Sequence, residues 1–190
     1  MERARKPASI LIVFVALIIA LATAGQALAQ SFGEWQAVKA VSARFNSFEQ
    51  AQKAGYSIAG EPCVAAPPGA MGIHAVNRDL AGDLAIDALQ PEILVYLPEE
   101  DGSLRLIGLE YFSVALANSE AGPVPWFADA PPPNGWFNPA PTVFGRTFDG
   151  PMPGHNPSMP WHYDLHVWLW ASNPSGTFAM FNPSLSCPGG

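Results

Sequence analysis

The sequence predicts an α+β domain whose main body is an antiparallel β-sheet or a small barrel, preceded by one or two N-terminal helices. Apolar residues recur at helical steps of three and four near the start of the chain. Further along, short segments rich in β-branched and aromatic residues lie between turn residues, which is typical of strands. Residues 122–160 hold 11 of the 20 prolines among many aromatic residues, so we expect a long ordered loop there.

The start of the chain resembles a secretory signal peptide. Three basic residues precede an apolar run, and Ala27-Leu28-Ala29 supplies the small residues of a cleavage site. We therefore expect residues 1–29 to be removed and residues 30–190 to form a single exported domain, periplasmic or extracellular. The alternative is a retained membrane anchor, because the apolar run is close to the minimum length of a membrane-spanning helix.

The expected mature chain is acidic. Removal of the first 29 residues leaves 6 basic and 15 acidic side chains, a formal net charge of −9. This charge argues against nucleic acid as a partner and against stable membrane association after cleavage. The two cysteines, Cys63 and Cys187, are expected to form one disulfide. The alternative, two thiolates on a metal, lacks a neighbouring Cys or His at ligand spacing.

Residues 34–54 are expected to be helical and to pack on the sheet. The apolar residues of this pattern are Trp35, Val38, Val41, Phe45 and Phe48. Ser47 begins a capping box, Ser47-Phe48-Glu49-Gln50, which predicts a second short helix that ends at Gly55.

Several strands follow an expected ordered loop at residues 60–70. They lie at 72–77, 92–98 and 104–116, with a short strand near 142–148. Residues 99–102 supply the turn of a hairpin between the second and third of these strands. The last long strand is expected in the aromatic segment WHYDLHVWLW, residues 161–170.

This aromatic segment contains two of the four histidines. Side chains alternate between the two faces of a strand, so His162, Asp164 and His166 share one face, which Trp168 and Trp170 continue. The opposite face is apolar and is expected to lie in the core. Alternate positions are roughly 6 to 7 Å apart, so two imidazoles can converge on one ion.

Two further residues suit such an ion. His74 lies in a predicted strand close to glycines that allow a close approach of the backbone. Glu110 lies mid-strand among apolar neighbours, and a buried carboxylate needs a cation or a histidine as its partner. Arg146 is an alternative partner for Glu110. We therefore predict a mononuclear metal centre with the ligands His74, Glu110, His162 and His166.

Two or three imidazoles with one carboxylate suit zinc, iron, copper or manganese rather than calcium or magnesium. Four neighbouring residues are candidates to support a ligand or to address a substrate: Asn77, Tyr111, His155 and Asp164. The simpler interpretation is that these histidines are hydrogen-bonded core residues or a polar row that faces water.

Other functions remain open at this stage, and the sequence specifies no reaction. A binding module for glycans or other small molecules would use an aromatic platform without metal, and its candidate residues are Trp126, Trp136, Trp161, Trp168 and Trp170. Glu110 and Asp164 could also act as paired carboxylates in sugar hydrolysis. A stable exported domain without a small-molecule site is the third alternative.

The order of motifs resembles a family of small exported bacterial proteins. The resemblance covers about Arg44 to Cys187 and depends on three motifs: M-G-x-H-x-V-N at 71–77, the Glu110-Tyr111 pair, and H-V-W followed by N-P-S-G. It implies no specific reaction. It implies that His74, Asn77, Glu110 and His166 are recurring polar positions. The His/Glu ligand set is similar to that of small barrels such as the cupins, but the cupin spacing, His-x-His followed closely by Glu, is absent.

Overall fold

The computed structural model describes residues 32–188, except 59, 61 and 156. The expected signal peptide and its cleavage site lie outside these residues. Within the described part of the chain, the helices are too short or too polar to cross a membrane. Residues 32–42 form a helix. The elements that follow are η1 (Ala43–Asn46), α2 (Phe48–Lys53), β1 (Tyr56–Ile58), β2 (Val64–Ala66), β3 (Gly69–Asn77), α3 (Arg78–Asp83), β4 (Ile93–Pro98), β5 (Leu104–Val114), β6 (Leu116–Ala117), β7 (Val124–Pro125), β8 (Thr142–Val143), β9 (Arg146–Thr147), β10 (Asp149–Met152) and β11 (His162–Val167).

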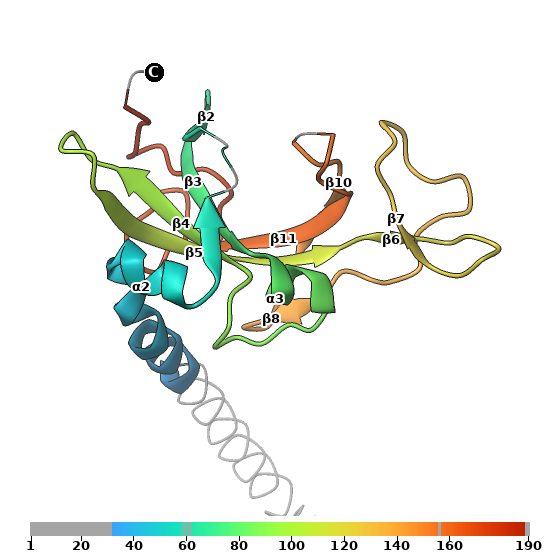
Figure 1. Ribbon diagram of the computed structural model, residues 1–190, viewed down its shortest axis with the longest axis horizontal. Helices are drawn as coiled ribbons and strands as arrows, with labels where there is room; N and C mark the ends of the chain where they lie inside the picture. The colour runs from blue at the N-terminus through green and yellow to red at the C-terminus, as the bar shows by residue number, and fades with distance from the viewer. Residues whose placement is uncertain (1–31, 59, 61, 156, 189–190) are drawn as a thin grey trace, which may run out of the picture.

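Seven of the described strands form one antiparallel sheet in the order β1-β3-β4-β5-β11-β10, with β2 paired to β3. The sheet is open, so the predicted α+β class is confirmed in its sheet form rather than as a closed barrel. Figure 1 shows the N-terminal helices beside one end of the sheet and the β6-β7 pair projecting from the other end.

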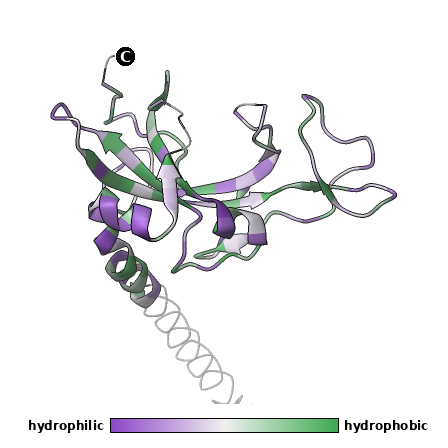
Figure 2. Cartoon of the chain, in the orientation of Figure 1, coloured by the Kyte–Doolittle hydropathy of each residue, from purple (hydrophilic) through white to green (hydrophobic). Residues whose placement is uncertain are grey.

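The helices cover one face of the sheet, here called the helix-covered face. Val38, Phe45 and Ala51 pack there against a row of strand residues: Leu94, Tyr96, Leu109, Tyr111, Tyr163, Leu165 and Val167. Figure 2 shows that β4 and β5 are rich in the apolar residues that this packing buries. Each fully buried aliphatic side chain contributes about 1.5–3 kcal/mol, so this cluster is the main source of stability.

The opposite face, here called the cavity face, has a smaller apolar cluster. Val95, Leu97, Ile107 and Trp168 form it, and Leu185 from the C-terminal segment packs against it. The predicted disulfide is confirmed beside this cluster, where Cys63 and Cys187 are joined with an S–S distance of 2.02 Å. The disulfide ties the loop before β2 to the end of the described chain.

The helical prediction is partly confirmed. The segment is interrupted by η1 and ends before Gly55, which has a φ of +94° that favours glycine. Ser47 is the N-cap of α2, but its side chain makes no capping hydrogen bond, so the capping box is wrong. Its backbone carbonyl accepts from the N–H groups of Gln50 and Ala51 instead. Val41 is 37% exposed and is not a packing residue.

The strand predictions needed three corrections. The expected loop at 60–70 contains β2 and the start of β3, and the strand near 142–148 is the small β8-β9 hairpin. The aromatic strand ends at Val167, where the Leu169 N–H turns back to the Val167 carbonyl. Trp168 therefore packs on the cavity face, whereas the Trp170 indole donates to Ser42 Oγ in the N-terminal helix.

A further correction concerns the face of β5 that carries Glu110. Simple alternation places Leu104 and Leu106 on that face, but the pairing of β4 with β5 shifts between Val95 and Tyr96. Leu106 consequently lies opposite Tyr96 in the core of the helix-covered face. A β-bulge reverses the facing of residues on its two sides, so the prediction fails on the N-terminal side of the shift.

Candidate metal centre

Three strands place polar side chains together on the cavity face. Glu110 of β5 lies directly opposite His166 of β11. His74 of β3 lies opposite Val95 of β4, which is the strand between β3 and β5. Paired residues of antiparallel strands point to the same face, so all three side chains share the cavity face.

A glycine allows the close packing of β3 on β4 near His74. Gly72 has a φ of +113°, and a Cβ atom there would lie 2.6 Å from the Tyr96 carbonyl oxygen. Any other residue at this position would push β3 away from β4. The close backbone approach expected from the glycines near His74 is thus confirmed at Gly72.

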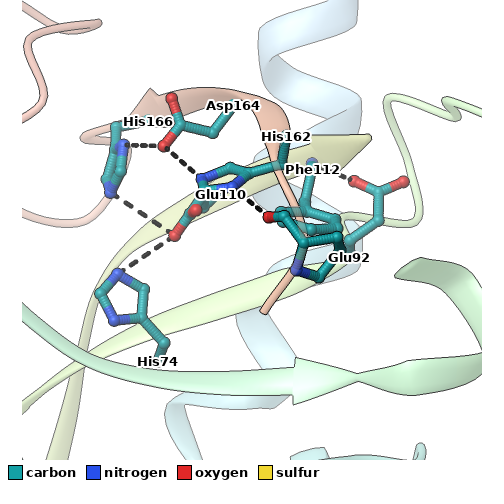
Figure 3. A network of polar contacts seen from close by, with 8 residues as sticks. His74, Glu92, Glu110, Phe112, His162, Asp164 and His166 are labelled. Atoms are coloured by element: carbon teal, nitrogen blue, oxygen red, sulfur yellow. Dashed lines mark hydrogen bonds and ion pairs between the residues drawn. The ribbon is translucent and has the colours of Figure 1, made fainter. Parts of the chain in front are cut away.

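The three side chains meet at one carboxylate oxygen. His74 Nε2 lies 3.1 Å and His166 Nε2 3.4 Å from Glu110 Oε2, as Figure 3 shows. One ligand atom from each residue lies within 4.8 Å of the others, and all three residues are buried. This buried His74/Glu110/His166 cluster, here called the His-Glu-His cluster, can hold a metal ion.

Four buried side-chain atoms in the described chain have no hydrogen bond: Glu110 Oε2, His162 Nε2, Asp164 Oδ1 and His166 Nε2. Glu110 Oε2 is within ion-pair distance of two imidazoles, those of His74 and His166. A buried polar atom without a hydrogen bond costs roughly 1–3 kcal/mol. Two of the four atoms belong to the His-Glu-His cluster, and a metal ion that takes them as ligands would remove that cost.

The protonation states of the cluster suit metal binding. Burial opposes the ionisation of Glu110, but the imidazoles of His166 and His74 outweigh burial and lower its pKa to about 2. Burial lowers the pKa of His166, against the opposing charge of Glu110. Burial thus favours the neutral imidazole of His166, which is the form that binds metals.

Asp164 and His162 lie next to the cluster on the same face. Asp164 Oδ2 is 3.9 Å from His166 Nδ1 and 3.9 Å from His162 Nε2, and Figure 3 shows it between the two rings. Burial, with the charge of Glu110 as a smaller cause, raises the pKa of Asp164 to about 8. Burial lowers the pKa of His162, whose ring stacks on Phe112 at a centroid distance of 5.0 Å. His162 is not among the described residues whose ligand atoms all lie within 4.8 Å of one another.

The remaining candidates do not belong to the His-Glu-His cluster, although His155 lines the cavity beside it. His155 is exposed on the loop, with its ring centroid 6.0 Å from that of His162. Asn77 caps α3 by accepting from the Asp79 and Leu80 N–H groups. Tyr111 points to the helix-covered face and donates its hydroxyl to the Ala88 carbonyl. Arg146, the alternative partner of Glu110, lies over the Phe178 ring.

A cavity of about 550 Å³ opens beside the cluster. His74 and Glu110 line it, together with apolar residues of the sheet, residues of α3 and the end of the Pro-rich loop. This volume is within the range of small-molecule sites. The sequence interpretation missed α3, although Asn77 is among the residue types preferred at a helix N-cap.

The tryptophans do not form one exposed platform. Trp161 and Trp168 are buried, and Trp136 packs against Trp161 at a centroid distance of 5.2 Å. Trp168 and Trp170 belong to clusters on opposite faces of the sheet. The geometry therefore favours the polar cluster over an aromatic platform as the functional site.

Comparison of the chain with protein-family models, with curated proteins and with solved structures finds no match. The interpretation of the His-Glu-His cluster therefore depends on its own geometry and chemistry.

Proposed function

We propose that this chain is an exported metal-binding protein with a mononuclear site formed by His74, Glu110 and His166. The observation that carries the proposal is the convergence of three buried ligand atoms, two of which have no hydrogen bond. Such atoms are rare in folded proteins, and each one calls for an explanation such as an ion. A bound ion explains both atoms at once.

The donor set supports a transition metal. Two imidazoles and one carboxylate are the ligands of several catalytic zinc sites and of non-haem iron oxygenases, and copper and manganese also accept them. Three protein ligands leave an open coordination position, and His74 and Glu110 line the cavity beside it. When bound, such an ion supplies a Lewis acid or an activated water. The proposed function therefore includes catalysis as an option for this site.

The chain's own residues have distinct parts in this proposal. Glu110 partly neutralises the charge of the ion, and His166 presents its Nε2 from the neighbouring strand. Asp164 Oδ2 lies 3.9 Å from Nδ1, the other ring nitrogen of His166, on the side from which a carboxyl group can orient a ligand imidazole. His162 is left out of the ligand set, because its Nε2 faces Asp164 rather than the cluster.

Export is supported by the disulfide. A Cys63–Cys187 bond persists in oxidising compartments and is rare in reducing ones. Residues 1–29 would direct the chain to such a compartment.

The test is elemental analysis of the mature protein, purified from an oxidising compartment without a histidine tag or chelator. We expect about one equivalent of a transition metal in the wild type and in His155→Ala, and none in His74→Ala or His166→Ala. His162→Gln should keep the metal if the site has three ligands, and should lose it or bind it more weakly if His162 is a fourth ligand. Circular dichroism of each variant, compared with chelator-stripped wild type, shows whether it is folded. A folded His166→Ala protein that keeps a full equivalent would refute the assignment.

A further inference from the structure

The cavity beside the cluster has an apolar wall. Val76, Ile93, Phe112 and Val114 from the sheet line it, and Met159 and Pro160 close it from the loop. Buried apolar surface of this kind binds the hydrocarbon body of a ligand. A bare inorganic ion would leave this surface unused, whereas an organic molecule would cover it.

The charged residues of the lining are few. Glu110 is the single carboxylate among the described lining residues, and it is already engaged with two imidazoles. Arg78, the first residue of α3, is the single arginine or lysine there. The cavity consequently carries an available positive charge, although the chain as a whole is acidic.

Arg78 differs from the other basic side chains of the described chain. Lys53 and Arg105 form ion pairs with Glu49 and Glu99. The other three lie over aromatic rings, and these are Lys39, Arg44 and Arg146. Among the described residues, neither a carboxylate nor an aromatic ring is a partner of Arg78. Its guanidinium thus remains available to a ligand, and this group matches carboxylate and phosphate geometry.

We propose that the cavity binds a small organic anion whose charged group pairs with Arg78 and whose apolar body lies against Phe112 and Val114. This inference rests on the proposed metal site, because a donor atom of the same ligand would face the open position beside His74 and Glu110. The cavity has room for such a molecule. Gly82 of α3 borders it, and a Cβ atom there would meet nothing within 4 Å.

The experiment compares four ligands of similar size in ligand-observed NMR titrations of the metal-loaded protein. Benzoate and phenyl phosphate are anions, benzyl alcohol is neutral and benzylamine is a cation. We expect the two anions to bind at least tenfold more tightly than the neutral and the cationic ligand. The ratio of the affinities for benzoate and phenyl phosphate shows which anionic group the cavity prefers. Arg78→Gln should remove the preference for anions, and Arg105→Gln, which changes an arginine outside the cavity lining, should keep it.

The outcomes separate this inference from the proposed metal site, because metal content is measured in the same samples. Equal binding of all four ligands, or a preference for anions that survives in Arg78→Gln, overturns the inference while the metal site stands. Wild-type protein that takes up no metal overturns the proposed function instead. In that case the same titration of the metal-free protein still decides whether Arg78 selects anions.

Discussion

On the helix-covered face of the sheet, the four tyrosine hydroxyls each donate to a backbone carbonyl, whereas on the cavity face four buried polar atoms have no hydrogen bond. The tyrosine bonds are 2.6–2.9 Å long and go to the carbonyls of Pro91, Phe45, Ala88 and Asn138. The same sheet therefore completes its polar contacts on one face and leaves them incomplete on the other.

The difference fits the proposal that the helix-covered face is built for stability and the cavity face for binding. A satisfied hydroxyl contributes roughly 1 kcal/mol, but a buried atom without a partner reduces stability. The cavity face bears this cost at Glu110 and His166, beside an apolar cavity. Costs of this kind concentrate at functional sites, where a ligand provides the missing contact.

The largest expected effect is that of metal on stability. Because the proposed ion binds only the folded cluster, metal at 1,000 times its Kd should raise the free energy of unfolding by about 4 kcal/mol over the chelator-stripped protein. Urea unfolding with and without metal measures this change. His166→Ala should show none of it, and an unchanged wild-type midpoint would mean that the cavity face has no specific ion site.

The next effect concerns Glu92, which is buried just before β4 and accepts a hydrogen bond from the Phe112 N–H. Burial raises its pKa from 4.5 to about 8. Between these pH values the folded state keeps a proton that the unfolded state releases, so stability falls as pH rises through this window. Glu92→Gln should therefore raise the free energy of unfolding at pH 7 by up to about 3 kcal/mol.

Urea unfolding of Glu92→Gln at pH 4.5 and at pH 7 tests the sign. The gain should nearly vanish at pH 4.5, where the wild-type carboxyl is protonated in the folded state. Glu100→Gln, an exposed position in the β4-β5 turn, is the control and should change little at either pH. A gain that is equal at both pH values would show that Glu92 is ionised in the folded protein.

A smaller effect tests the helix-covered face. Tyr96→Phe removes the hydroxyl that donates to the Phe45 carbonyl and leaves this buried acceptor without its partner, which should cost roughly 1–2 kcal/mol. Metal content should stay at one equivalent, because the hydroxyl lies on the face away from the cluster. Loss of metal in a folded Tyr96→Phe protein would show that the two faces are not independent.

The smallest effect is expected at Asn77. Asn77→Ala removes the cap of α3 and should cost about 1 kcal/mol. If Asn77 is only a cap, the variant loses stability and keeps its affinity for benzoate. If Asn77 contacts a ligand instead, the affinity for benzoate changes without this loss of stability. Thermal unfolding and benzoate titration of the same sample separate the two roles.

Local patterns predicted part of this arrangement. Alternation along residues 162–167 places His162, Asp164 and His166 on one face and apolar residues on the other, and the structure confirms it because β11 is regular. The helix and strand patterns predicted an α+β fold, and the two cysteines of a chain expected to be exported predicted one disulfide; the structure confirms the fold class and the disulfide.

The contacts between strands were not predictable from local patterns. Glu110 faces His166 because of the register between β5 and β11, and His74 reaches them across β4. Register depends on long-range packing, and the shift at Val95 and Tyr96 shows that alternation fails when a bulge intervenes. The sequence also does not show that Arg78 lacks a carboxylate or an aromatic ring as its partner among the described residues, because such contacts form only in the folded chain.

Anomalous X-ray diffraction from wild-type crystals saturated in turn with zinc, iron, copper and manganese tests the metal site itself. We expect one strong peak between the three clustered residues, roughly 2.0–2.2 Å from Nε2 of His74, Nε2 of His166 and a carboxylate oxygen of Glu110 for zinc. Crystals that show no peak there with any of the four metals would contradict the proposal. The His-Glu-His cluster would then be a buried ion-pair network without a bound metal.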